Sequence, residues 1–283
     1  MLIESTLYQD SADDKAALSE TYFKVTGSRM NWKSPRGFFE KMAWLKIFDR
    51  RSEMVQIVDK ATAGCIARSK CRQVLVPSVY GIYSAPHEIN WDALPEHLVV
   101  KATHGSKMVK KVDKREMNVG ELEEMMSNWL QTTYGKQRRE WVYKHVEPKI
   151  MIEEVIGYHR ETINDYKFYC FEGEPLLVHV DVCRNVNHQR AFFDPHWNRV
   201  NFEFGRYSVY QGDLEPPAKL SDMLDFARKM SKGFHFLRVD MYSIEDTFYF
   251  GEATLFPGGG WARLYPKNAN ATWGAWLTNV PHI

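Results

Sequence analysis

Two acidic residues on neighbouring apolar segments form the pattern in this chain with the clearest chemistry. Asp240 lies within residues 237–242, and Glu252 lies within residues 248–254. Both segments are rich in aromatic and branched residues, which is typical of strands, and the polar residues between them favour a turn. Folded back as a hairpin, they bring Asp240, Glu252 and Thr254 around one small volume. Buried carboxylates need a positive partner, and Mg²⁺ is commonly held by one or two carboxylates plus substrate phosphates. The pattern predicts a cation site, and the alternative is two solvated acids on an edge hairpin.

A lysine and the loop after it are candidate ligands for phosphate. The lysine ends an apolar strand predicted over 98–102, where a charged side chain needs a reason to be. A short loop with Gly and Ser offers backbone N–H groups and a hydroxyl to phosphate oxygens, and lysines supply charge. The chain has no GxxxxGK[ST] P-loop, and a surface turn with two solvated lysines is the alternative. The residues concerned are Lys101, His104, Gly105, Ser106 and Lys107.

Other cations lie close to acids in the predicted strands. Strand alternation places Asp165 and Lys167 on one face, and Arg238 on the same side of its strand as Asp240. Arg184 follows the next strand along the chain. An arginine fork suits carboxylate or phosphate. Each cation alone is more readily structural, but their convergence on two acids favours an anion-binding site.

A strand end near residue 157 has the composition of a purine contact. Val155 and Ile156 can present backbone N–H and C=O groups to adenine, while Glu153 or Glu154 accepts from an amine or a ribose hydroxyl. The alternative is a capped strand end with one exposed glutamate.

The elements that must position these residues change character along the chain. The first seventy residues are predicted to be helical, with Asp59 as the N-cap of a helix that begins at Lys60 and ends near Cys71. Strand patterns dominate afterwards, 187–217 is polar and irregular, and the tail after Pro257 is loop-like. The pattern predicts an α+β chain with mostly antiparallel strands in two lobes around a crevice. Helices are expected at 13–18, 37–48, 59–71, 121–133 and 220–232, and strands at 74–76, 79–83, 98–102, 148–157 and 165–182, before the hairpin.

Composition excludes several classes of protein. The chain has 283 residues, 37 Lys and Arg against 36 Asp and Glu, and a net charge of +1, so nothing indicates a nucleic-acid-binding protein. No HExxH, GxSxG or paired CxxC motif occurs, and loosely spaced histidines do not favour zinc. The start lacks a signal-peptide pattern, no apolar run is long enough for a bilayer, and four unpaired cysteines indicate a cytoplasmic protein. The Lys107–Arg115 run, with five cations, is either part of an anion cleft or a solvated face.

The ordered series of these motifs resembles the ATP-grasp superfamily, and within it the TupA-like ATP-grasp family, which is associated with cell-surface polysaccharide biosynthesis. The similarity spans roughly residues 58–277, and the combination is specific although each motif alone is not. The strings that carry it are Asp59-Lys60, Val99-Val100-Lys101, His104-Gly105-Ser106, Ile152-Glu153-Glu154-Val155-Ile156, Asp165-Tyr166-Lys167-Phe168, Arg238-Val239-Asp240 and Glu252-Ala253-Thr254-Leu255-Phe256-Pro257-Gly258-Gly259.

The resemblance implies a role for each matching residue. Two α+β lobes with mostly antiparallel sheets enclose ATP, after a short helical N-terminal segment. The implied phosphate ligands are Lys60 and Lys101, with a loop at His104, Gly105, Ser106 and Lys107; the adenine hinge comprises Glu153, Glu154, Val155 and Ile156. The implied metal ligands are Asp240, Glu252 and Thr254, which hold Mg²⁺, two ions with Glu252 between them; Thr254 stands where relatives have Asn. Arg238 is implied as a charge stabiliser at the transferring phosphoryl group, Lys167 and Arg184 as contacts to phosphate or to an acidic substrate, and His104 as a phosphate contact or proton carrier.

These assignments lead to one leading hypothesis and its rivals. The expected enzyme is a ligase that converts ATP to ADP and phosphate, and amidates a uronic acid of a capsule, O-antigen or exopolysaccharide precursor with an amino acid or amino alcohol. The rivals are a sugar kinase, a glycosyltransferase (for which no Asp-x-Asp motif occurs) and a nucleotide-binding module without turnover. The expected parts are a helical segment at 1–72, one lobe at 73–157 and a second at 158–283. Asp240→Asn and Glu252→Gln are expected to lose turnover with the fold intact.

Overall fold

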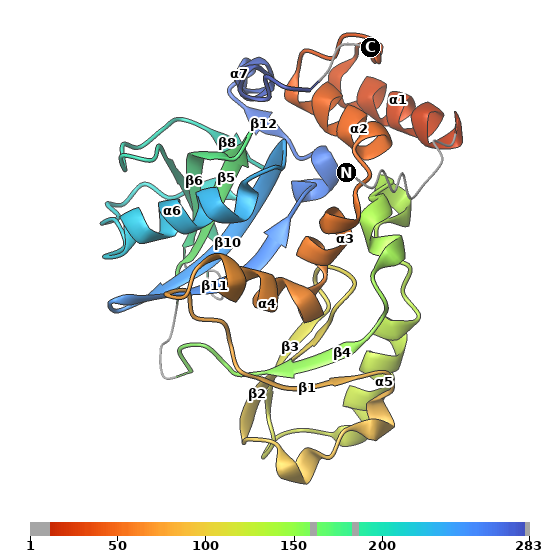
Figure 1. The fold of residues 1–283 in the computed structure, drawn as a ribbon, viewed down its shortest axis with the longest axis vertical. Coiled ribbons are helices and arrows are strands. Elements are labelled where there is room, and N and C mark those ends of the chain that lie inside the picture. Colours follow the sequence, from red (N-terminus) through yellow and green to blue (C-terminus); the bar gives the residue numbers. More distant parts are fainter. Residues whose placement is uncertain (1–11, 159–162, 183–186, 281–283) are drawn as a thin grey trace.

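The computed structural model describes residues 12–158, 163–182 and 187–280, and they form an α+β fold built on two main sheets (Figure 1). The helices are α1 Ala12–Thr26, α2 Phe38–Phe48, α3 Ser52–Val58, α4 Lys60–Lys70, α5 Val119–Leu130, α6 Leu220–Ser231 and α7 Ala269–Trp276, with short 3-10 helices η1 Pro86–Glu88, η2 Trp91–Ala93, η3 Lys136–Arg138, η4 Trp141–His145 and η5 Pro257–Gly260. The strands are β1 Val79–Tyr83, β2 His97–Ala102, β3 Val109–Asp113, β4 Ile150–Glu153, β5 Asp165–Phe171, β6 Glu174–Val182, β7 Gln189–Phe193, β8 Glu203–Phe204, β9 Ser208–Val209, β10 Phe236–Ile244, β11 Thr247–Thr254 and β12 Leu264–Tyr265.

The smaller sheet has the strand order β1-β4-β2-β3, and all its pairs are antiparallel. Burial alternates along β2, so that Leu98 and Val100 pack against α5 while Val99 and Lys101 face the other way. In the β2–β4 register Val99 lies opposite Glu153 and Lys101 opposite Met151. Lys101 and Glu153 are therefore diagonal neighbours on the face turned away from α5.

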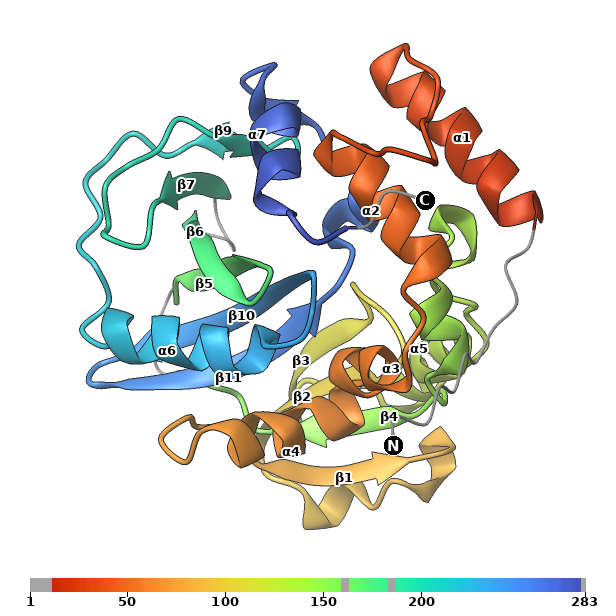
Figure 2. The same cartoon turned by 45° about the horizontal axis from the view of Figure 1, so that its top comes forward.

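The larger sheet has the order β11-β10-β5-β6-β7-β9, antiparallel except for the β7–β9 pair. Helix α6 packs along β5, β6 and β10, with Phe226 fully buried. Figure 2 shows α4 between β11 and the smaller sheet, and α3 and α4 contact β11. The helical start of the chain is thereby built into the core of the larger sheet.

The N-cap predicted for α4 is confirmed. The Asp59 carboxylate accepts a hydrogen bond from the backbone N–H of Ala61 at 2.9 Å, and Cys71 is the C-cap. Lys60 is therefore the first residue of a fixed helix, and its backbone N–H also donates to the carbonyl of Thr103 at 3.4 Å.

We expect Asp59→Ala to lower the free energy of unfolding by about 1 kcal/mol, because the cap of α4 loses its acceptor. Urea unfolding followed by circular dichroism measures the change. Asp225→Ala is the matched control, since Asp225 forms a 2.6 Å ion pair with Lys229 on the exposed side of α6. Equal losses in the two variants would contradict a specific role for the cap.

Three sequence expectations are wrong in detail. Residues 74–76 form an isolated bridge between Leu75 and Tyr249 instead of a strand. The 187–217 segment contains β7, a sheet strand whose Phe192 and Phe193 are buried. The tail after Pro257 contains the helix α7, and the Trp273 side chain of this helix is fully buried.

Aromatic packing explains why the tail forms a helix. The Trp273 ring lies 5.2 Å from that of Phe38 and 5.4 Å from that of Tyr169, centroid to centroid. Helix α7 thus packs against α2 over the end of the larger sheet.

Candidate active site

The β10–β11 hairpin brings the two predicted metal ligands together. Asp240 lies directly opposite Glu252, and Arg238 lies opposite Thr254. The predicted hairpin is confirmed, with a turn shorter than expected: only residues 245 and 246 lie between the strands.

The two acids have different surroundings. Asp240 is 2% exposed and accepts from Arg238 through both oxygens at 2.6 Å, and from Lys167 at 3.0 Å. Burial raises the pKa of Asp240, but the charges of Arg238 and Lys167 outweigh burial and lower the pKa below its ordinary value. The Glu252 side chain is 35% exposed and lies 4.0 Å from Lys60 Nζ and 3.4 Å from Arg238 Nη2. Asp240 is thus a buried counter-ion, whereas Glu252 is accessible.

Lys167 lies at the centre of a buried ionic network. Its Nζ is 2.5 Å from Asp165, 3.0 Å from Asp240 and 3.6 Å from Asp181. Burial lowers the pKa of Lys167, but these carboxylates raise it above its ordinary value. The structure confirms that Asp165 and Lys167 share a face, and it surrounds Lys167 with acids before any substrate is present.

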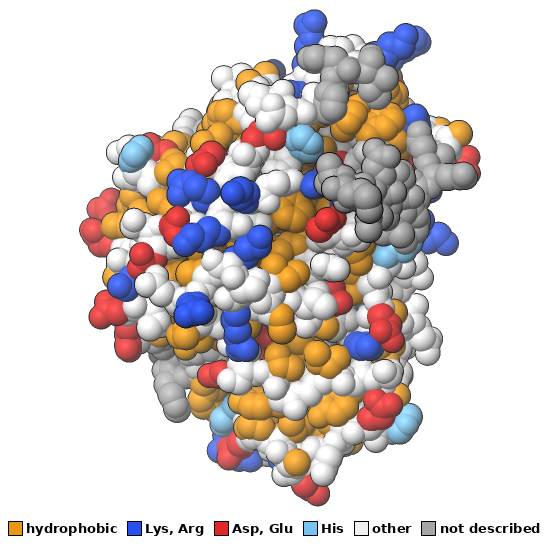
Figure 3. Space-filling model, in the orientation of Figure 1, with side chains coloured by type: hydrophobic (Ala, Val, Ile, Leu, Met, Phe, Trp, Pro, Cys, Tyr) orange, Lys and Arg blue, Asp and Glu red, His pale blue; other side chains and the backbone are white. Residues whose placement is uncertain are grey.

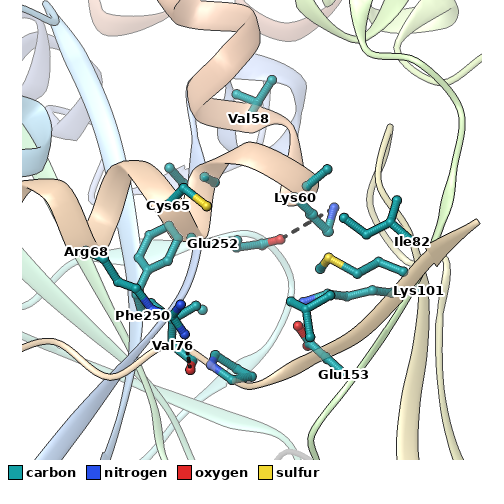
Figure 4. A pocket seen from close by; sticks show the side chains of 18 residues that line it. Val58, Lys60, Cys65, Arg68, Val76, Ile82, Lys101, Glu153, Phe250 and Glu252 are labelled. Carbon is teal, nitrogen blue, oxygen red and sulfur yellow. Dashed lines mark hydrogen bonds and ion pairs between the residues drawn. The ribbon is translucent and has the colours of Figure 1, made fainter. Parts of the chain in front are cut away.

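An apolar cavity of about 260 Å³ lies between the two sheets (Figure 4). Val58, Val76, Ile82 and Phe250 are among its apolar residues, and the side chains of Lys60, Lys101, Glu153 and Glu252 converge on it. Figure 3 shows apolar side chains gathered over the lower part of one face, where the smaller sheet lies, and the exposed Val79 and Ile82 line the cavity. Apolar walls with a few converging polar groups are typical of a small-molecule site.

The two lysines approach this cavity from different elements. Lys101 Nζ lies 2.5 Å from Glu153 Oε1. Lys60 Nζ donates to the carbonyl of Gly105, and burial lowers the pKa of Lys60 while Glu252 opposes that shift. Lys101 thus lies beside Glu153, and Lys60 lies beside Glu252, so each lysine is held in place at the cavity by a neighbouring group.

We expect Lys101→Ala to raise the Kd for ATP about tenfold, because a charge beside the apolar cavity is lost. Isothermal titration calorimetry with ATP and Mg²⁺ measures the affinity. Lys111→Ala, on the exposed β3 of the same sheet, is the control and is expected to bind ATP as the unchanged protein does. An unchanged affinity in Lys101→Ala would remove Lys101 from the phosphate site.

The loop predicted to cover phosphate is only partly placed for that role. Ser106 and Lys107 are exposed and line two cavities. His104 is 2% exposed, and its Nε2 lies 3.1 Å from the carbonyl of Trp129, so the ring is directed toward the end of α5. Burial lowers the pKa of His104. This placement does not agree with the expected roles of His104 in phosphate binding or proton transfer.

The segment predicted as an adenine hinge is also divided. Glu153 lines the apolar cavity, but Glu154 is bound to Ser78, whose backbone N–H donates to the Glu154 carboxylate at 3.1 Å. Val155 and Ile156, the predicted adenine contacts, are not among the described residues that line this cavity. Arg184 lies outside the described residues.

Two further cavities continue from the apolar one toward the larger sheet. A bridging cavity of about 150 Å³ is lined by Lys60, the 105–107 loop, Arg238 and Thr254. A basic cavity of about 890 Å³ follows it, and Glu252 lines all three. The cations that line the basic cavity are Lys107, Arg138, Arg139, Lys167, Arg190, Arg206 and Arg238.

Several of these residues escaped the sequence analysis. Arg138 lies on a loop fixed by Lys46, a fully buried lysine of α2 whose Nζ donates to the carbonyls of Arg138 at 2.7 Å and Gly259 at 2.6 Å. Burial lowers the pKa of Lys46 to about 7, and the charge of Glu140 opposes that shift. Gly259 has φ +68°, and a Cβ there would meet Arg138, so this turn requires glycine. The sequence did contain one sign of this buried contact, because Lys46 is a charged residue between the apolar Leu45 and Ile47 of a predicted helix.

The residues present fit a nucleotide with a hard cation. Glu252 lines all three cavities and is free to hold Mg²⁺ together with phosphate oxygens, whereas Asp240, opposite it on the hairpin, would first have to exchange Arg238 or Lys167 for the cation. Thr254 Oγ1 accepts from Arg238 at 3.2 Å, which leaves it a weak ligand. Elsewhere in the described residues Glu96, His97 and Asp113 cluster, but Arg115 lies 2.7 Å from both acids and accounts for them as ion pairs.

The arrangement of two sheets around a lysine-lined cavity and a carboxylate hairpin defines an ATP-grasp protein. The model of the TupA-like ATPgrasp family matches residues 40–278, and the chain belongs to that family. Membership supports an ATP-binding site in the cavity between the two sheets.

Solved structures with similar folds are ligases of low sequence identity. D-alanine–D-alanine ligase from Bacillus anthracis, complexed with ATP, is 18% identical with a TM-score of 0.43, over 77% of this chain and 56% of that one. The corresponding ligase from Helicobacter pylori is 13% identical with a TM-score of 0.46, over 81% and 64%. ATP-grasp ligase PsnB, complexed with minimal precursor, Mg and ADP, is 10% identical with a TM-score of 0.44, over 85% and 65%. The chain thus spans less than two thirds of these proteins, and no curated protein matches it.

None of the helices in the described ranges combines the length and the apolar character that crossing a membrane requires.

Proposed function

We propose that this protein is an ATP-dependent carboxylate–amine ligase that forms an amide through an acyl phosphate. We propose as its substrate a uronic acid of a capsule, O-antigen or exopolysaccharide precursor, and as its amine an amino acid or amino alcohol. The observation that carries the proposal is the basic cavity, which adjoins the nucleotide site at Glu252. A cytoplasmic location, where ATP is available, and the absence of nucleic-acid or membrane partners belong to the same proposal.

The charge of the basic cavity supports an acidic acceptor. Among the described residues, its cations Lys107 and Arg206 have no carboxylate within ion-pair distance, and Arg138 interacts with the charge of Glu140 only at longer range. Clustered cations without counter-ions attract anions and hold them by charge-assisted hydrogen bonds. A carboxylate substrate supplies the missing negative charge at the place where the γ-phosphate arrives.

The first half-reaction follows from this placement. An oxygen of the substrate carboxylate attacks the γ-phosphorus of ATP, the bond to the β,γ-bridging oxygen breaks, and ADP leaves. Lys60 and Lys101 bind the α- and β-phosphates, and Arg238 neutralises charge on the transferring group. Glu252, with Asp240 once that carboxylate exchanges a cation partner and Thr254 through water, would hold Mg²⁺, which would supply further neutralisation.

The second half-reaction transfers the acyl group to nitrogen. The amine attacks the acyl carbon, the bond from that carbon to the phosphate oxygen breaks, and inorganic phosphate leaves. Because an acyl phosphate reacts readily with water, the loop that carries Ser106 and Lys107 has to close over it. We assign Lys167 a different role from the substrate contact that the sequence predicted for it. Its ammonium group pairs with Asp165, Asp181 and Asp240 and holds these carboxylates in position.

A trapping assay tests the proposal. The protein is incubated with ATP, Mg²⁺, hydroxylamine and a panel of uronic acids, and ADP, phosphate and hydroxamate are measured. Hydroxamate formed with ADP supports the ligase. ADP with a phosphorylated sugar supports a sugar kinase instead, and consumption of a UDP-sugar without ADP supports a glycosyltransferase.

A further inference from the structure

One imidazole faces the basic cavity. Among the described residues that line the three cavities meeting at Glu252, His188 is the only histidine. It directly precedes β7 of the larger sheet, and residues of α1 line the same cavity. The reaction proposed above needs a proton acceptor on this side, because an amine is mostly an ammonium ion at neutral pH and an ammonium ion is not a nucleophile.

His188 is held against a carboxylate and an aromatic ring. Its Nε2 is buried and lies 2.7 Å from Asp181 Oδ1, an ion-pair distance at which the ring makes no hydrogen bond, while the side chain as a whole remains 16% exposed. Its ring lies 3.9 Å from that of Tyr207, centroid to centroid. Because Nε2 faces Asp181, Nδ1 is the ring nitrogen left for a proton from the cavity.

Asp181 stays ionised in this setting. Burial raises its pKa, but the hydrogen bond from His179 and the charges of Lys167 and Arg190 outweigh burial and lower the pKa well below its ordinary value. An ionised carboxylate 2.7 Å from one imidazole nitrogen stabilises the imidazolium that forms when the ring takes a proton. The groups that face this pair are His179 of β6 at 2.9 Å and Arg190 of β7 at 2.9 Å from Oδ1, Lys167 of β5 at 3.6 Å from Oδ2, and Tyr207 before β9.

We propose that His188, whose protonated form the charge of Asp181 stabilises, is the general base that deprotonates the incoming amine; this inference rests on the proposed ligase function. The ammonium form of the amine gives one proton to Nδ1 of His188. The free amine then attacks the acyl carbon, and the carbon–oxygen bond to phosphate breaks. The departing phosphate takes the second proton from nitrogen, and the imidazolium returns its proton to solvent.

Two other titratable groups nearby do not fit this role. His179 is 1% exposed, and burial lowers its pKa to about 4 despite the hydrogen bond to Asp181. Glu140 lines the bridging cavity, on the nucleotide side of Glu252, and is 4% exposed. Among the described histidines, His188 alone lines the basic cavity and has a carboxylate, that of Asp181, beside it.

Amines of different basicity test the proposal. With ATP, Mg²⁺ and the uronic acid that gives most hydroxamate, His188→Gln is compared with the unchanged protein at pH 7, using either hydroxylamine or ethanolamine. Hydroxylamine is already unprotonated at this pH, so its rate is expected to stay within about threefold, whereas the ethanolamine rate falls about 10²-fold. Raising the pH toward 9 restores the variant about tenfold per pH unit, because the amine then loses its proton to solvent.

His196→Gln is the matched control, since His196 is exposed and lies outside the three cavities. It is expected to use both amines as the unchanged protein does. Equal rates in His188→Gln and His196→Gln, or an equal loss with hydroxylamine and ethanolamine, overturn the base assignment and leave the ligase standing. No hydroxamate from the unchanged protein with any uronic acid overturns the ligase itself, and the base role with it.

Discussion

Glu252→Gln is expected to lower the rate of ADP formation at least about 10³-fold while the protein stays folded. Glu252 is the residue shared by the apolar, bridging and basic cavities, so its charge acts where nucleotide and acceptor meet. An amide in its place keeps the size of the side chain but removes the negative charge that holds a cation at the transferring phosphoryl group. Because the side chain is 35% exposed, we expect the free energy of unfolding to change by less than about 1 kcal/mol. ADP release and urea unfolding measure the two effects.

Asp240→Asn is the informative comparison, because the structure revises what the sequence predicted for it. Asp240 is buried between Arg238 and Lys167, so an amide there leaves two buried cations with less compensation. We expect a loss of about 3 kcal/mol in stability along with the loss of turnover. Normal activity in Glu252→Gln would remove the metal assignment from the hairpin. A fully stable Asp240→Asn would show that the buried network is weaker than its geometry indicates.

The sequence predicted those parts of the site that depend on local patterns. Alternation along two short strands was enough to place Asp240 opposite Glu252 and Arg238 beside Asp240. In the same way, Asp59 marks the start of α4 by a rule that involves only neighbouring residues. The α+β fold with mostly antiparallel sheets followed from the same strand and helix patterns.

The rest depended on contacts between distant segments. Lys46 fixes Arg138 across 92 positions of sequence, and His188 meets Tyr207 through the packing of a loop, so neither pattern is visible locally. The orientation of His104 depends on where α5 ends, because the ring contacts the Trp129 carbonyl. The phosphate role predicted for His104 rested on its closeness in sequence to Lys101. The direction of its side chain, which the sequence does not reveal, argues against that role.

Lys167→Met is expected to lower the free energy of unfolding by about 3–5 kcal/mol at pH 7. The substitution removes a cation that contacts Asp165, Asp181 and Asp240 together, and buried carboxylates without compensation are strongly destabilising. The methionine fills a similar volume, so the loss reports charge more than packing. Urea unfolding from pH 4 to pH 8 measures it.

The pH dependence distinguishes charge from packing. In the unchanged protein the pKa values of Asp181 and Asp240 are lowered, so their ionised forms stabilise the fold above about pH 4, and this contribution is lost as the pH falls further. Removing the cation raises these pKa values, so protonation relieves the variant and its deficit shrinks as the pH falls from 7 toward 4. Lys229→Met is the control, because Lys229 pairs with Asp225 at 2.6 Å on an exposed helix surface, and its removal is expected to leave the stability nearly unchanged at every pH. A deficit in Lys167→Met that is the same at every pH would point to lost packing and contradict the ionic role of this lysine.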